Sequence, residues 1–142
     1  MAVRTARAIW SGSLKEGRGI MTFGGGAFEG AYSFPSRFET APGNSPEELL
    51  AAAHAGCFSM ALSGVLNHAG YTPNRIETSA HIYLEAVEGG AAITKIELST
   101  AAEIPNIDEE TFTQLAEEAK KTCPVSKALA GVPVIMLKVK LQ

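Results

Sequence analysis

The sequence predicts a domain of the α+β class. Strand-like segments come first, joined by short glycine-rich turns. One long apolar helix follows, and a hairpin, two further helices and a last strand complete the chain. Short turns between successive strands produce antiparallel pairing, because parallel strands need a long crossover connection. We therefore expect antiparallel sheets packed on a long central helix and a second helix, in a single domain over residues 1–142.

The composition is that of a folded protein with no affinity for nucleic acid. Hydrophobic residues make up 46% of the chain, charged residues 19%, and the net charge is -3. A globular domain of this kind lacks the basic patch that binds phosphate backbones. The N-terminal residues contain no apolar signal segment, which predicts a cytoplasmic protein. Residues 49–66 are uncharged, but five alanines and two glycines make them only weakly hydrophobic, so we expect a core helix and no membrane partner.

The first third of the chain predicts three strands, over residues 3–11, 20–23 and 31–38. Gly17-Arg18-Gly19 separates the first two strands, and Gly24-Gly25-Gly26 separates the second from the third. The triple glycine is interpreted as a flexible turn and not as a phosphate-binding loop, because no Lys-Ser/Thr pair follows it.

The strongest local signal marks the start of the long helix. Ser45 can cap it, Pro46 suits its first position, and Glu48 can complete a capping box. The helix is expected to end near Ala69, because Gly70 favours a left-handed stop. Since it is apolar on most sides, we expect it to be central.

The remaining segments predict a hairpin followed by a helical stretch and a strand. Residues 75–86 and 91–104 alternate apolar and polar positions around Gly89-Gly90, which is typical of a hairpin. The last elements are a helix capped by Asp108 that ends near Lys121, a short helix from Cys123 to Gly131, and a strand over 132–141.

Two cysteines in a chain predicted to be cytoplasmic suggest either a redox pair or two inert core thiols. Cys57 lies mid-helix among small apolar residues, where burial would raise its pKa, so reactivity requires a cation or strong hydrogen-bond donors from elsewhere in the fold. His54, one turn earlier, could act as an imidazolium or be an ordinary hydrogen-bonded core residue. Cys123 precedes Pro124 at a helix start, where backbone N–H groups lower a thiol pKa.

Arg37 and Glu47 are further candidates. Arg37 lies between aromatic residues and is a suitable donor to a thiolate or a peroxide oxygen. Glu47 is ten residues before Cys57, roughly 15 Å along one helix, so it cannot reach its own Cys57 side chain. Either a second subunit brings a carboxylate to the thiol, or Glu47 and Glu48 merely stabilise the helix dipole.

Four motifs resemble the OsmC/Ohr superfamily, the osmotically inducible and organic hydroperoxide resistance proteins, with the OsmC branch the closer match. They are Asn44-Ser45-Pro46-Glu47-Glu48-Leu49, residues 52–62 around His54-Ala55-Gly56-Cys57, Ile93-Thr94-Lys95-Ile96, and Lys121-Thr122-Cys123-Pro124-Val125-Ser126. The two cysteine motifs in this order are specific, and together the motifs span nearly the whole chain.

The resemblance implies an OsmC-like fold in an intertwined homodimer with sites at the subunit interface. It implies a cysteine-based peroxidase for organic hydroperoxides, in which Cys57 attacks the peroxide and Cys123 resolves the sulfenic acid. Arg37 and Glu47 would be the family's Arg-Glu pair, with Arg18 as the competing arginine. The resemblance implies no metal and no bound cofactor, and an external dithiol of the dihydrolipoyl type or similar as reductant.

The expected substrate preference follows from apolar residues near the thiol. A face around Leu50, Phe58 and Met60 should favour organic hydroperoxides over hydrogen peroxide. The alternative function is a dimeric, stress-related module that binds an apolar small molecule beside Cys57 without turnover.

Overall fold

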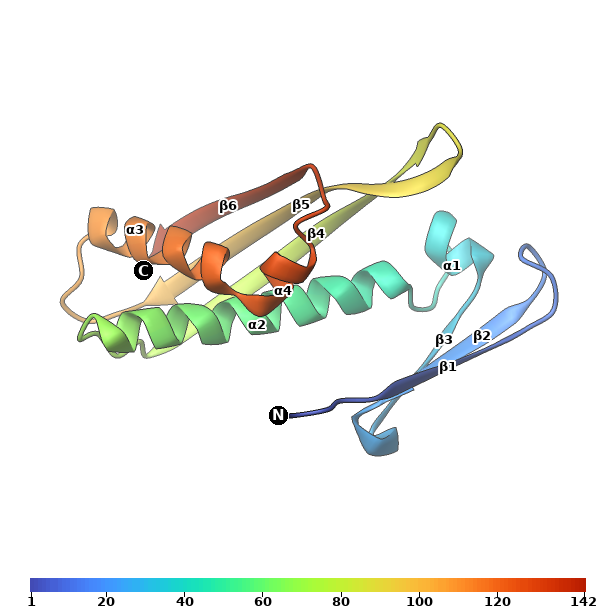
Figure 1. Ribbon diagram of the computed structural model, residues 1–142, viewed down its shortest axis with the longest axis horizontal. Coiled ribbons are helices and arrows are strands. Elements are labelled where there is room, and N and C mark those ends of the chain that lie inside the picture. Colours follow the sequence, from blue (N-terminus) through green and yellow to red (C-terminus); the bar gives the residue numbers. More distant parts are fainter. The chain divides into compact units, whose positions relative to one another are not determined.

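The computed structural model describes all 142 residues, which divide into two compact units, Met1–Leu49 and Leu50–Gln142 (Figure 1). The elements in chain order are β1 (Ala6–Ser11), β2 (Arg18–Phe23), the 3-10 turn η1 (Gly24–Gly26), β3 (Phe28–Tyr32), α1 (Phe34–Phe38), α2 (Pro46–His68), β4 (Arg75–Val87), β5 (Gly90–Glu103), α3 (Glu109–Thr122), α4 (Pro124–Ala128) and β6 (Val134–Leu141). The α+β class predicted from the sequence is confirmed, and the boundary between the units falls inside α2.

The N-terminal unit contains the predicted antiparallel meander. β1 pairs with β2, and β2 pairs with β3. The glycines of η1 have φ values of 64°, 66° and 94°, a left-handed conformation that suits glycine and confirms a turn at this position. The predicted turn at residues 17–19 is wrong, because Arg18 and Gly19 already belong to β2 and the chain reverses over residues 12–17.

The predicted strand over residues 31–38 is also wrong. β3 ends at Tyr32, and α1 begins at Phe34 because Ser33 and Ser36 form a capping box, each side chain accepting from the other's backbone N–H. The Ser36 hydroxyl also donates to the Asn44 carbonyl over 2.8 Å. These contacts place Arg37 on a short helix and not on a strand end.

The C-terminal unit is built on the sheet β4-β5-β6. β4 and β5 form the predicted hairpin, but β6 runs parallel to β5, so this sheet is mixed and not purely antiparallel. The physical reason is the connection from β5 to β6, which passes through α3 and α4 and returns the chain in the same direction. α4 ends at Ala128, three residues before the predicted Gly131.

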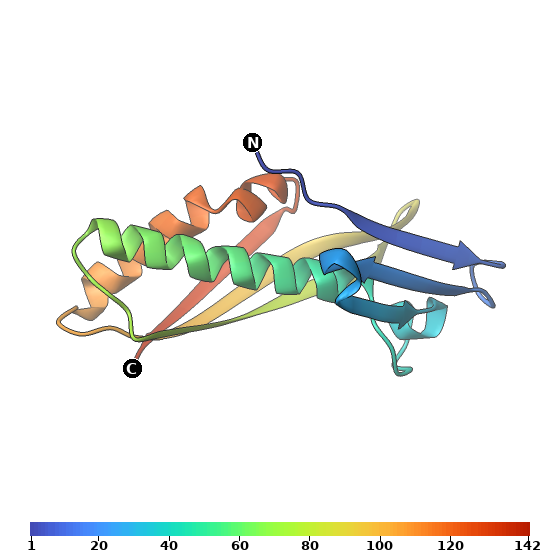
Figure 2. The same ribbon diagram turned by 90° about the horizontal axis from the view of Figure 1, so that it is seen from below.

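α2 and α3 lie on one face of this sheet (Figures 1 and 2). Their side chains form the core with those of the sheet. The core-facing stripe of α2 repeats every fourth residue through His54, Phe58, Leu62 and Leu66, and all four side chains are fully buried. They meet a stripe of β5 and the apolar side of α3; the buried partners are Leu98, Ala102, Ile104, Phe112, Ala116 and Ala119.

α2 is central to its unit, as predicted, but within the single chain only one stripe of this apolar helix is buried. Met60 is 80% exposed, and Ala53, Gly56 and Gly64 are exposed on the same side of the helix. Within its unit, α2 packs against one sheet and the helices α3 and α4, and these cover one stripe of its surface. By length and composition α2 could also cross a membrane, a test that core helices pass as well.

The helix signals read from the sequence are confirmed. The Ser45 hydroxyl accepts from the Glu48 N–H over 3.2 Å and donates to the Glu48 carboxylate over 3.0 Å. Gly70 has a φ of 92°, the left-handed conformation expected just after the helix. Asp108 caps α3 by accepting from the Thr111 N–H over 2.8 Å.

Candidate functional site

Arg37 and Glu47 form an ion pair in the N-terminal unit. Arg37 Nη2 and Nε donate to Glu47 Oε1 over 2.8 Å and 3.1 Å, and Glu47 is only 8% exposed. A buried carboxylate that accepts two charged hydrogen bonds holds the guanidinium in one orientation. Nη1 has no protein partner, so it can donate to a negatively charged group.

The sequence left two questions open about this ion pair. One is whether Arg18 or Arg37 is the partner of Glu47, and the other is whether Glu47 merely stabilises the helix dipole. Arg18, the competing arginine, is exposed on β2 and forms no ion pair with Glu47. Glu48 is exposed and bonded to Ser45, as a first-turn capping residue is. Glu47 therefore has a specific partner in Arg37 beyond the helix dipole, and the catalytic roles of both residues stay predictions.

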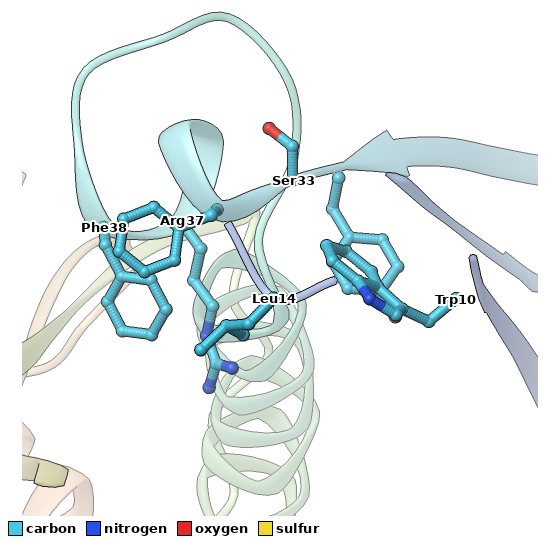
Figure 3. Close-up of a pocket in the computed structure, with 7 residues that line it drawn as sticks. Trp10, Leu14, Ser33, Arg37 and Phe38 are labelled. Atoms are coloured by element: carbon cyan, nitrogen blue, oxygen red, sulfur yellow. The ribbon is translucent and has the colours of Figure 1, made fainter. Parts of the chain in front are cut away.

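The Arg37 side chain lines a pocket of about 230 Å³, together with several aromatic residues (Figure 3). The Arg37 Cζ lies 5.0 Å from the centroid of the Phe38 ring, and Figure 3 shows the arginine extending alongside Leu14. The sequence interpretation of Arg37 as a guanidinium held against apolar surface is confirmed by this contact. The residues that line the pocket are Trp10, Leu14, Tyr32, Ser33, Phe34, Arg37 and Phe38.

Sequence reasoning missed four of these lining residues, Trp10, Leu14, Tyr32 and Ser33. The centroids of the Trp10 and Tyr32 rings are 5.4 Å apart. Trp10 on β1 and Tyr32 on β3 are the two residues that pair with Gly19 of β2, the strand between them. A side chain at Gly19 would collide with both rings. A glycine inside an otherwise regular strand is the one signal that could have marked this close approach.

The two cysteines lie together in the C-terminal unit. Their sulfur atoms are 3.0 Å apart, although 66 positions separate the residues in the sequence. Cys57 on α2 is partly exposed, Cys123 is fully buried at the N-cap of α4, and both are free thiols. The two sulfur atoms are therefore close enough to form a disulfide, which requires two-electron oxidation of the thiols and a shortening of this distance to about 2.05 Å.

The pKa values of the two thiols move in opposite directions. Burial and the hydrogen bond with Cys123 raise the pKa of the Cys57 thiol. Burial also acts to raise the pKa of Cys123, but the hydrogen bond with the Cys57 thiol and the influence of the Ser126 backbone N–H and hydroxyl outweigh it and lower the pKa. Within one chain, the donors at the start of α4 therefore favour a thiolate at Cys123.

His54 is a hydrogen-bonded core residue, one of the two alternatives that the sequence left open. Its Nε2 atom lies 2.7 Å from the Ser126 hydroxyl, its side chain is fully buried, and burial lowers its pKa below the usual value. A neutral imidazole cannot stabilise a thiolate by charge. The imidazolium role considered for His54 is therefore not supported.

The apolar substrate face predicted from Leu50, Phe58 and Met60 is not present as one surface. Phe58 points into the core and has no exposed area, whereas Met60 is 80% exposed. The two residues are two positions apart on a helix, which directs their side chains about 200° apart. The pocket around Arg37 does combine apolar walls with a cation.

The chain is similar to known proteins of one family. The family model described as OsmC-like protein matches residues 39–138. Peroxiredoxin OsmC of Escherichia coli (strain K12) is 45% identical over 127 residues, which is 89% of each chain. An organic hydroperoxide resistance protein of Xanthomonas axonopodis pv. citri is 29% identical over 130 residues, 89% of this chain and 87% of the relative.

A solved structure agrees with the sequence matches. The organic hydroperoxide resistance protein OhrB of Bacillus subtilis superposes with a TM-score of 0.71 at 26% identity, covering 99% of this chain and 100% of that chain.

Proposed function

Since this chain belongs to the OsmC-like protein family, we propose that it is a cysteine-based peroxidase that reduces organic hydroperoxides to alcohols. The relatives named peroxiredoxin OsmC and organic hydroperoxide resistance protein support a peroxide-related function. The observation that carries the finer proposal is the 3.0 Å approach of the Cys57 and Cys123 sulfur atoms, which suits a reversible disulfide.

In the first step, the Cys57 thiolate attacks the terminal oxygen of the hydroperoxide. An S–O bond forms, the O–O bond breaks, and the alkoxide takes a proton and leaves as the alcohol. We assign the attack to Cys57 because it is the more exposed of the two thiols, whereas Cys123 is fully buried behind it. Cys57 is then a sulfenic acid.

In the second step, Cys123 attacks the sulfur of the Cys57 sulfenic acid. The S–S bond forms, the S–O bond breaks, and hydroxide takes a proton and leaves as water. An external dithiol then reduces the disulfide by exchange and is itself oxidised to a disulfide. The net reaction converts one hydroperoxide and one dithiol into an alcohol, water and the oxidised reductant.

Arg37 supplies the cation that Cys57 lacks within its own unit. The pKa of Cys57 is raised, so a thiolate at neutral pH requires a positive partner. Arg37 is suitable because Glu47 fixes two of its nitrogens and leaves Nη1 to donate to sulfur or to a peroxide oxygen. We propose that the complete site lies at the interface of a homodimer, since α2 alone holds Glu47 roughly 15 Å from Cys57 along its axis.

The preference for organic hydroperoxides follows from the apolar residues that line the pocket beside Arg37. Apart from Arg37 itself and Ser33, the residues that line the Arg37 pocket are aromatic or aliphatic. Covering an alkyl or aryl group with such apolar surface is favourable, and hydrogen peroxide has no such group. We propose that the reaction takes place in the cytoplasm, where reducing dithiols are present.

The experiment that tests the proposal is stopped-flow oxidation of the reduced protein by cumene hydroperoxide and by hydrogen peroxide, with Cys57→Ser as the comparison. Rapid oxidation that depends on Cys57 and is faster with the organic peroxide supports the peroxidase. Equally slow oxidation of both proteins would contradict it and favour a module that binds an apolar small molecule without turnover.

A further inference from the structure

One glycine of the N-terminal sheet lies buried beneath two aromatic rings. Gly19, on the middle strand β2, does not have the positive φ at which glycine is required, so its backbone conformation is open to any residue. Glycine inside a strand weakens it, because glycine loses the most conformational freedom on folding and has no side chain to pack. The position therefore calls for another explanation.

Lack of space explains this glycine. The three atoms nearest to a Cβ added at Gly19 all belong to the Trp10 and Tyr32 rings, and one atom of the Trp10 ring would be only 2.7 Å away. Gly17 differs, because a Cβ there would also lie 2.7 Å from the Ser11 carbonyl oxygen. Gly19 is therefore required by the two rings and not by the backbone.

The two rings lie between Gly19 and the pocket beside Arg37. Trp10 and Tyr32 line that pocket, whereas Gly19 does not. The Trp10 Nε1–H donates to the Gly12 carbonyl oxygen over 3.2 Å, which holds the indole in place. Figure 3 shows the Trp10 ring and the Arg37 side chain on two sides of the pocket. Rings pushed away from β2 by a side chain at position 19 would therefore move into the pocket.

The pocket is small enough for such a shift to change what it holds. Its volume is about 230 Å³, below the range of about 300–1,000 Å³ that is typical for pockets of drug-sized ligands. Its aromatic walls suit a compact group with a single aromatic ring, because aromatic side chains contact such a ring in offset or edge-to-face geometry. A narrower pocket would exclude this group before it excluded a tert-butyl group, which is smaller.

We propose that Gly19 determines the size of the organic group that the pocket accepts: without a side chain there, the Trp10 and Tyr32 rings lie against β2 and leave room beside Arg37 for an aryl group. The inference rests on the proposed function and deepens it, because it names arylalkyl hydroperoxides as the substrates that fit. In this role Gly19 acts only through the two rings, so it determines specificity and takes no part in the chemistry.

Ligand binding tests the inference without any peroxide. Trp10 is the single tryptophan of the chain, so its fluorescence reports on the pocket. The reduced protein is titrated with cumyl alcohol, the product of cumene hydroperoxide reduction, and with tert-butyl alcohol. The parent should bind cumyl alcohol more tightly. Gly19→Ala should weaken the binding of cumyl alcohol roughly tenfold, as overpacking does, and that of tert-butyl alcohol much less.

Gly30→Ala is the matched control, because a Cβ at Gly30 would lie 2.7 Å from the Asn44 side-chain nitrogen, on the same sheet but outside the Arg37 pocket. It should leave the affinities for both alcohols unchanged. Gly19→Ala/Tyr32→Leu removes the ring atoms nearest to the new methyl group and should restore most of the binding of cumyl alcohol. Circular dichroism verifies that each variant is folded.

Tyr32→Leu alone tests the inference even if Gly19→Ala does not fold. Removal of one ring from the pocket wall enlarges the pocket, so the affinity for an alcohol with a naphthyl group should rise relative to that for cumyl alcohol. An unchanged ratio of the two affinities would contradict the role of the rings.

Three other results would overturn the inference. One is a parent protein whose Trp10 fluorescence does not respond to cumyl alcohol, and another is a folded Gly19→Ala protein with the affinity of the parent. The third is an equal loss of affinity for both alcohols in Gly19→Ala and in Gly30→Ala, which would indicate a general distortion of the sheet.

Failure of this inference and failure of the proposed function are distinguishable. Because the titration contains no peroxide, the selective loss in Gly19→Ala can be observed in a protein that proves to have no peroxidase activity. Conversely, an active peroxidase whose preference for cumene hydroperoxide over tert-butyl hydroperoxide is unchanged in Gly19→Ala would refute the role of Gly19 alone.

Discussion

The two cysteines differ in their surroundings, although their sulfur atoms lie 3.0 Å apart. Cys57 is partly exposed in the middle of a long helix, where burial and the hydrogen bond with Cys123 raise the thiol pKa and outweigh a backbone hydrogen bond from Val125. Cys123 is fully buried but occupies a helix N-cap, where free N–H groups and Ser126 lower its pKa. The chain by itself therefore favours the thiolate on the sulfur that a peroxide reaches less easily.

This difference shows what is missing from a single C-terminal unit. A partly exposed thiol with a raised pKa becomes an efficient nucleophile only when a positive group is added to its surroundings. The N-terminal unit contains a guanidinium that is already oriented and has one nitrogen free. Substitution of each residue can show whether the two thiols have different roles and whether Arg37 is the missing group.

The largest effect is expected from Cys57→Ser. Removal of the attacking sulfur should slow oxidation by cumene hydroperoxide by at least about a thousandfold, as loss of a catalytic nucleophile does. Stopped-flow measurement of the first oxidation step gives the rate. If Cys57→Ser still reacted rapidly while Cys123→Ser did not, the roles of the two thiols would be exchanged.

Cys123→Ser should abolish steady-state turnover but leave the first oxidation step nearly as fast as in the parent. Without a resolving thiol, the Cys57 sulfenic acid persists and excess peroxide converts it to sulfinic acid. Mass spectrometry after addition of one and of ten equivalents of peroxide distinguishes the two oxidation states. Sustained turnover in this variant would contradict the resolving role.

Arg37→Met should slow the first oxidation step by about a hundredfold, because a preorganised charged donor is lost from the reacting atoms. Glu47→Gln should have a smaller effect, since the guanidinium stays but loses a charged partner that orients it. Arg18→Met is the matched control and should be close to the parent in stopped-flow experiments. A large loss with Arg18→Met and none with Arg37→Met would transfer the role to Arg18.

The smallest effect concerns His54 and the stability of the fold. Its pKa is lowered in the folded protein, so between that value and about 6.5 the unfolded chain binds more protons. The contribution of neutral His54 to the free energy of unfolding is therefore complete above about pH 6.5. It decreases as the pH falls below that value, by at most about 1.4 kcal/mol per pH unit. Urea unfolding at pH 7.5 and pH 5.5 should show this loss for the parent and a smaller loss for His54→Gln. Equal losses in both proteins would show that other groups cause the pH dependence.

Much of the fold was determined by local sequence signals. Ser45, Pro46 and Gly70 specify the ends of α2 because capping and left-handed turns involve only neighbouring residues. The alternation in β4 and β5 specifies their hairpin for the same reason. The family and its two cysteine motifs could also be recognised from the sequence alone.

The site was only partly determined in this way. The sequence nominated Arg37 and Glu47 separately, and the resemblance paired them. Their contact depends on α1, which the sequence did not predict, because its capping box competes with a β-like run of residues around Phe34 and Phe38. A short helix whose start is fixed by two side-chain hydrogen bonds gives almost no signal in the hydrophobic periodicity of the sequence.

The tertiary structure alone decided which distant groups meet. Neither the 3.0 Å approach of the sulfur atoms nor the His54–Ser126 bond has a local signal, since the partners are 66 and 72 positions apart. The parallel alignment of β6 and the burial of only one stripe of α2 depend on how the chain returns through α3 and α4. Local patterns specify where elements begin and end, whereas the pKa of a thiol depends on the groups that the fold brings to it.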